Sequence, residues 1–176
     1  MWAVRLGRSF HVAPAPLRRW PRWILAIRLQ HVKGDQDATN KGGDIVNEAL
    51  EEAAVKAVTA DGFETLPHYC QRWTRQVVET VYGKRFEDVI HKANAISAGL
   101  ALRSAGYSIP LQNGSVPGDL LFKLHGSGGD GHVGIRVLGN KVAENSSVHW
   151  DGHDARGFRS LKEFGHFDLI IRLPLE

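Results

Sequence analysis

The periodicity of the chain changes at residues 106–118, GYSIPLQNGSVPG, a segment rich in Gly, Pro and Asn. Before it, apolar residues recur at helical spacing in three stretches: Asp44–Ala60, Pro67–Tyr82 and Phe86–Ala105. After it come four short apolar runs, typical of strands: Asp119–Leu124, His132–Leu138, Lys141–Asn145 and Leu169–Leu173. Helices followed by an antiparallel sheet predict an α+β domain.

The chain contains one cysteine, Cys70, near the start of the second predicted helix. A single thiol excludes an internal disulfide and a zinc site built from several cysteines. Thr65 and Pro67 indicate the start of that helix, and Gly83 ends it. The positive end of a helix dipole lowers the pKa of a thiol placed there, which favours a reactive thiolate. An inert buried thiol is the alternative, because Cys70 also shares an apolar stripe with Trp73.

A base for this thiol is predicted at the hairpin formed by the second and third strands. Gly139 and Asn140 suit a two-residue turn with positive φ. That register sets Gly134 opposite Asn145, so Asn145 shares a face with His132. Gly134 would also leave room for the cysteine helix to approach the histidine.

Asn145 is therefore the residue predicted to hold the imidazole of His132 with one ring nitrogen toward the thiol. A one-residue bulge at the turn would exchange the two faces of the strand and give this role to Glu144. A lone histidine on a strand is usually structural, so the hypothesis depends on Cys70, His132 and Asn145 together.

Three blocks in the order YCQRWTRQVVETVYG, VPGDLLFK and GHVGIRVLGNKVAENS resemble the pattern of NlpC/P60 and CHAP cysteine peptidases, over Leu66–Ser147. The resemblance implies a papain-like domain whose N-terminal helices pack on a C-terminal antiparallel β-sheet. It implies Cys70 as nucleophile and His132 as base. Tyr-Cys-Gln-Arg stands where NlpC/P60 members commonly have Asp-Cys-Ser-Gly, and Glu-Asn replaces a histidine. Both departures favour the CHAP side.

The resemblance further implies that the backbone amide of Cys70 binds the oxyanion, with Tyr69 or His68 as a second group. Peptidoglycan is the implied substrate, cut by a stem-peptide endopeptidase or an N-acetylmuramoyl amidase. The segment His149–Asp154 offers several metal ligands, but no distant fourth ligand accompanies this predicted loop. We expect no metal and no cofactor. A non-catalytic cell-wall or phage-tail module and a Cys-His acyltransferase are the alternative functions.

Residues 1–43 are predicted to be a basic arm and linker, and residues 44–176 the domain. The first 33 residues hold seven of the 22 Lys and Arg residues and none of the 19 Asp and Glu. Such an arm suits an anionic cell-wall polymer or a membrane surface, and a poorly ordered tail is the alternative; no nucleic acid is expected. The run Trp23–Ile27 is too short for a membrane span or an ordinary signal peptide. We expect a protein that is cytoplasmic until released, or virion-associated, and that acts at the cell wall.

Overall fold

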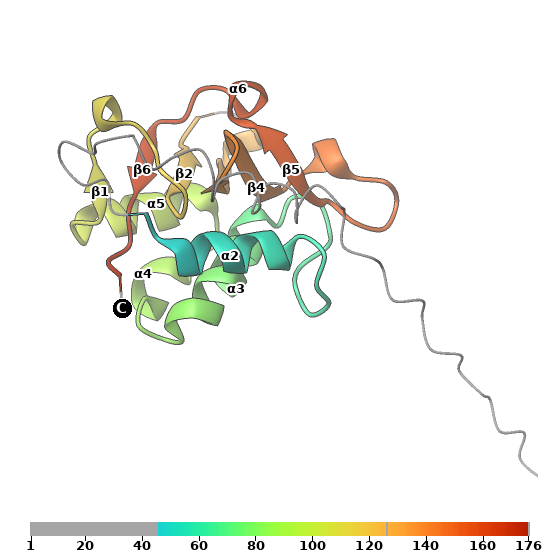
Figure 1. Cartoon of the computed structure of the whole chain (residues 1–176), viewed down its shortest axis with the longest axis horizontal. Helices are drawn as coiled ribbons and strands as arrows, with labels where there is room; N and C mark the ends of the chain where they lie inside the picture. Colours follow the sequence, from blue (N-terminus) through green and yellow to red (C-terminus); the bar gives the residue numbers. More distant parts are fainter. Residues whose placement is uncertain (1–45, 126, 176) are drawn as a thin grey trace, which may run out of the picture. The chain divides into compact units, whose positions relative to one another are not determined.

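Helices precede an antiparallel sheet in the computed structural model, which describes residues 46–125 and 127–175 (Figure 1). The helices are α2 (Glu48–Ala57), α3 (Cys70–Tyr82), α4 (Glu87–Ile90), α5 (Ala95–Ser104) and α6 (Leu161–Phe164), with 3-10 turns η1 (Leu111–Asn113), η2 (Ser127–Gly129) and η3 (Ser147–His149). The strands are β1 (Ser108–Ile109), β2 (Leu120–Lys123), β3 (His132–Val137), β4 (Lys141–Asn145), β5 (Arg156–Ser160) and β6 (Leu169–Ile171). The predicted α+β class is confirmed. The arm predicted for residues 1–43 lies outside the described residues.

Two asparagine side chains decide where helices begin. Asn47 caps α2 by accepting a hydrogen bond from the amide of Leu50, 3.1 Å away. Asn94 caps α5 in the same way, accepting from the amide of Ser97 at 2.9 Å. The single helix predicted for Phe86–Ala105 is therefore wrong, because this cap starts a new helix after α4. None of the helices in the described part of the chain has the length and apolar character that a membrane crossing needs.

The sheet is antiparallel, with strand order β1-β6-β2-β3-β4-β5, and is covered on both faces. The main core packs α2, α3 and α5 against one face, with Trp73 among its largest fully buried side chains. A smaller cluster of Leu121, Val142, Phe164 and Ile170 lies under α6 on the other face. Figure 1 shows α2 and α3 on one side of the sheet and α6 on the other. Alternation along each strand supplies both clusters.

The predicted register of the β3–β4 hairpin is wrong by one residue. Ile135 pairs with Ala143 and Val137 with Lys141, so the turn holds three residues, 138–140, instead of two. The side chain of Arg136 braces this wider turn by donating to the Lys141 carbonyl at 3.0 Å and the Asn140 side-chain oxygen at 2.6 Å. A slip of one residue exchanges the faces of the strand. Among the residues of β4, the alternation now directs position 144 to the histidine face and position 145 away from it.

Gly134 makes room for α6, not for the cysteine helix as predicted. A Cβ atom at this position would lie 2.4 Å from Cγ1 of Val142 and 3.2 Å from Cε2 of Phe164. Both neighbours belong to the smaller cluster under α6. The reason is the alternation along β3: Val133, Ile135 and Val137 enter the main core with α3, so position 134 lies on the opposite face, under α6.

The Pro-Gly-Asp block before β2 anchors the fold. The carboxylate of Asp119 accepts a bond from the Val116 amide at 2.8 Å and two bonds from the Arg172 guanidinium at 2.9 Å each. Gly118 packs against Asn47, where a Cβ atom would lie 2.5 Å from the backbone oxygen. This block of the resemblance therefore holds β2 and β6 in place and lies outside the cleft described below.

Candidate active site

Cys70 is the first residue of α3, three residues later than the predicted helix start. The segment before it is drawn out of helical geometry, since the Thr65 carbonyl accepts from the Ala155 amide at 2.8 Å and His68 has a φ of 72°. Tyr69 is the N-cap and its side chain makes no capping bond. The first amides of a helix lack partners within the helix, so the N–H groups at this end point toward the thiol's surroundings as donors.

His132 opens β3 directly after Gly131, at the end of the sheet that faces α3. Gly131 has a φ of 72°, and a Cβ atom there would lie 2.6 Å from the Lys123 carbonyl oxygen, so only glycine fits this turn. The turn delivers a mostly buried imidazole whose Nε2 lies 2.6 Å from Oε2 of Glu144. The ring also interacts with the Cys70 thiol, which lines the same cleft. Since Nε2 faces the carboxylate, Nδ1 is the nitrogen left for the sulfur.

The surroundings of His132 favour its protonated form. Burial alone would lower the pKa of the imidazole, but the hydrogen bonds with Cys70 and Glu144 outweigh burial and raise this pKa to about 9. The ring therefore carries a proton at neutral pH. A protonated imidazole beside a sulfur atom stabilises a thiolate and is ready to act as a general acid.

Glu144 is fully buried and accepts three hydrogen bonds. Oε2 receives Nε2 of His132 at 2.6 Å and Nη2 of Arg159 at 2.8 Å, while Oε1 receives Nε2 of His149 at 3.1 Å. Burial would raise the pKa of this carboxyl group, yet the three donors together lower it well below its usual range. Glu144 is thus ionised and aimed at His132.

Asn145 does not orient His132, which corrects the prediction. Its Nδ2 donates to the backbone oxygen of Glu64 at 2.9 Å, on the opposite face of β4 from the imidazole. The residue is buried and lines the cleft near Cys70, so it supports the wall of the site. The one-residue slip of the hairpin is the physical reason that Glu144 takes the place predicted for Asn145.

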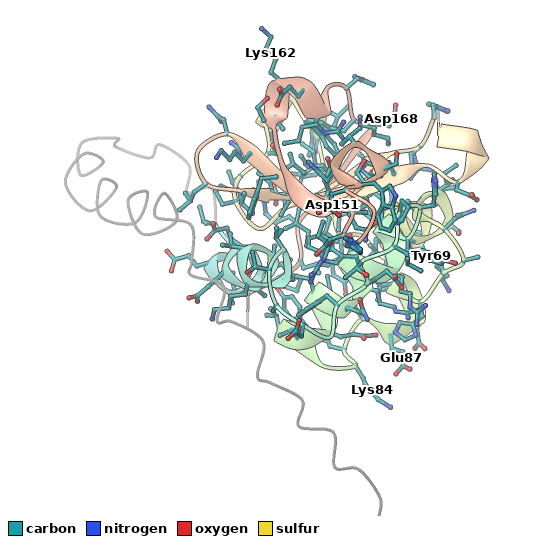
Figure 2. The ribbon with its side chains drawn as sticks, turned by 90° about the vertical axis from the view of Figure 1, so that its right-hand side faces the viewer. Tyr69, Lys84, Glu87, Asp151, Lys162 and Asp168 are labelled. Carbon is teal, nitrogen blue, oxygen red and sulfur yellow. The ribbon has the colours of Figure 1, made fainter. Side chains whose placement is uncertain are left out.

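A cleft of about 740 Å³ opens over Cys70 and His132. Tyr69, which is 46% exposed, and His68 also line it, and their role at the oxyanion stays a prediction. Its lining has one carboxylate, that of Asp130, and five basic side chains: Arg72, Arg75, Lys92, Lys123 and Arg159. In Figure 2, Tyr69 lies between the helical part of the domain and the loop that carries Asp151. The lining therefore has more basic than acidic side chains, although Arg72, Arg75 and Arg159 are paired with Glu64, Glu79 and Glu144, respectively.

Sequence reasoning missed two groups that contact the site through Glu144. His149 lies in the segment predicted to be a loop without a metal, and Arg159 lies on β5, a strand that the sequence did not predict. The segment RGFRS lacks a run of apolar residues, and its side chains are all partly exposed. No signal in the chain alone links these two positions to Glu144, because both contacts depend on the pairing of β4 with β5 and on the turn at η3.

Comparisons with known proteins find similarity among solved structures. No protein family and no curated protein matches the chain. Among the solved structures that match is the NlpC/p60 domain of peptidoglycan hydrolase SagA, with 21% sequence identity and a TM-score of 0.49 over 73% of this chain and 100% of that one. The residues of this chain, and not that likeness, support the function given below.

Proposed function

We propose that the protein is a cysteine hydrolase that cleaves amide bonds of peptidoglycan through Cys70, His132 and Glu144. The observation that carries this proposal is the imidazole of His132, which shares one cleft with the Cys70 thiol, interacts with it, and bonds a buried carboxylate through Nε2. Nucleophile, base and orienting group are the three parts that nucleophilic catalysis by a thiol needs. An inert structural cysteine has no need of a protonated imidazole and a buried carboxylate beside it.

The geometry supports a two-step reaction. Sγ of Cys70 attacks the amide carbonyl, and the backbone amide of Cys70 at the start of α3 donates to the oxyanion. The protonated ring of His132 passes its proton to the departing amine as the carbon–nitrogen bond breaks, leaving a thioester on Cys70. Water then attacks the thioester while His132 takes one of its protons, which releases the carboxylic acid and restores the thiolate with the imidazolium.

Glu144 serves both steps without contacting the substrate. Its bond to Nε2 fixes the orientation of the ring, and its charge stabilises the imidazolium form. The donors from Arg159 and His149 keep the carboxylate ionised and in place. In such an arrangement the carboxylate holds the correct ring tautomer and does not itself take up the proton.

Peptidoglycan is proposed as substrate on two grounds. The three sequence blocks resemble those of NlpC/P60 and CHAP enzymes, and the cleft carries the cationic lining described above. Stem peptides of peptidoglycan bear free carboxylates close to their amide bonds, which suit Lys and Arg side chains. A cut within the stem peptide fits this lining better than a cut at the lactyl amide of muramic acid, so the endopeptidase is favoured over the amidase.

Mass spectrometry of purified peptidoglycan tests the proposal. After incubation with the full chain we expect fragments with new amino and carboxyl ends inside the stem peptide. Cys70→Ala, a matched protein without the nucleophile, should release none of them. Free, intact stem peptides would identify an amidase instead. A digest that is unchanged by the protein, or equally changed by Cys70→Ala, would contradict the hydrolase.

A further inference from the structure

His149 occupies a place in the fold that only a missing side chain makes possible. It lies at the end of η3, and its ring turns back over β5 at Gly157, the residue that pairs with Glu144. A Cβ atom on Gly157 would lie 2.6 Å from both Cγ and Nδ1 of the His149 ring. The backbone of Gly157 is outside the left-handed region, so the space taken by the imidazole, and not backbone conformation, requires glycine there.

The two oxygens of Glu144 are unequally supplied with donors. Oε2 receives both His132 and Arg159, whereas His149 is the donor that the structure gives to Oε1. A buried carboxylate oxygen without a donor is costly, so loss of His149 would favour rotation of the carboxylate toward other donors. Besides the two histidines, the charged donor near Glu144 is the Arg159 guanidinium, 2.8 Å from Oε2. Rotation of the carboxylate toward this guanidinium would weaken the bond from Oε2 to His132.

We propose that His149 is a positioning residue for the reaction: held over Gly157, it fixes Oε1 of Glu144 so that Oε2 stays on His132. This inference rests on the proposed function, because it needs His132 to act on Cys70. It extends the site from three residues to a chain of four, Cys70, His132, Glu144 and His149. The simpler reading is that His149 only fastens the loop after β4 to the sheet.

Three substitutions at one position separate these readings. His149→Gln keeps an amide N–H near the place of Nε2 and should still reach Glu144, whereas His149→Asn has a similar polarity but a side chain too short to do so. His149→Ala removes the donor completely. A fourth variant, Gly157→Ala, should displace the ring without altering any ionisable group. His153→Ala is the control, because it removes a histidine from the same loop whose ring makes no contact with Glu144.

The rate of Cys70 alkylation by iodoacetamide, followed against pH, is the readout that loop fastening alone would not move. Cys70 is the only cysteine, so labelling reports on this site alone. The alkaline limb of this profile is the change in rate as His132 loses its proton. For the unmodified protein and for His149→Gln we expect this limb at the same pH. In His149→Ala, His149→Asn and Gly157→Ala it should lie about one pH unit lower. Wall hydrolysis should fall on the order of tenfold, the size usual for groups that orient metal-bound histidines.

Each outcome decides between the readings. If the unmodified protein shows no alkaline limb that depends on His132, the proposed function fails, and this inference fails with it. If that limb is present but His149→Asn and Gly157→Ala share it unchanged, only the role of His149 is overturned. A lower melting temperature with an unmoved limb would likewise show a purely structural role. Should His149→Ala fail to fold, the Gln and Asn pair still gives the comparison.

Discussion

Nε2 of His132 lies 2.6 Å from Oε2 of Glu144, a carboxylate with no exposure to solvent. This contact joins the neighbouring strands β3 and β4 and fixes the ring in the lining of the cleft. Because this contact leaves the opposite nitrogen for Cys70, the orientation of one side chain determines whether the thiol has a usable base. The predictions below follow from this relationship and from the packing around it.

The pKa of His132 should fall when Glu144 loses its charge. In the folded protein the hydrogen bonds with Cys70 and Glu144 raise this pKa to about 9, so the imidazolium persists at neutral pH and is lost only as the pH rises through that value. Glu144→Gln keeps the shape but removes the negative charge, and the pKa should move down toward 6.5. NMR titration of the ring protons measures it. A pKa that stays near 9 would show that Glu144 does not stabilise the imidazolium.

Removing Glu144 should impair hydrolysis far more than removing Asn145. Glu144→Ala deletes the partner of His132, and we expect a rate loss of at least ~100-fold, as befits a lost orienting carboxylate. Asn145→Ala deletes the bond to the Glu64 carbonyl and should instead cost about 1–3 kcal/mol in the free energy of unfolding. Hydrolysis assays with urea unfolding compare the two. Equal rate losses in the two variants would show that Asn145 contributes to catalysis as much as Glu144 does.

Gly134→Ala should destabilise the sheet beneath α6. The new methyl group would lie 2.4 Å from Cγ1 of Val142, and Val142 is held in place by Phe164 on α6. We expect a loss of about 1–3 kcal/mol in the free energy of unfolding, typical of overpacking. Denaturant titration gives the value. A stability equal to that of the unmodified protein would mean that α6 shifts to accommodate the methyl group without loss of free energy.

The cationic lining of the cleft should contribute to substrate binding. Lys92→Glu places a negative charge on the wall of the cleft and should raise KM for stem-peptide fragments while leaving kcat nearly unchanged. Lys162→Glu is the matched control, since this lysine projects from α6 at the far end of the domain from Lys84 (Figure 2) and does not line the cleft. The effect should shrink at high salt. Equal KM values for the two variants would argue against carboxylate recognition at Lys92.

Much of the fold follows from periodicity alone. The second helix, the strands at β2, β3, β4 and β6, and the α+β class were predicted because their apolar spacing is regular. The two-residue strand β1 lies in the Gly- and Pro-rich segment expected to be irregular, and β5 was missed because its residues do not alternate. Short elements of this kind are set by pairing with β6 and β4, which local sequence does not encode.

The site was predicted in part, and the error has one physical cause. Cys70 and His132 were paired from their placement, and the structure brings them together. The choice between Asn145 and Glu144 depended on one residue of turn length. That length is set by Arg136, whose side chain bonds to the turn from a position four residues before Asn140. A side-chain contact of this kind overrides the two-residue turn that Gly139 and Asn140 favour in isolation.

The reactivity of Cys70 at pH 7 tests the central claim most directly. Because the imidazolium of His132 stabilises the thiolate, iodoacetamide should alkylate the unmodified protein at least ~10-fold faster than free cysteine. His132→Ala, with its fold verified by circular dichroism, should react no faster than free cysteine. If both proteins are alkylated at the same rate, the thiol and the imidazole do not act together, and the account of this site is wrong.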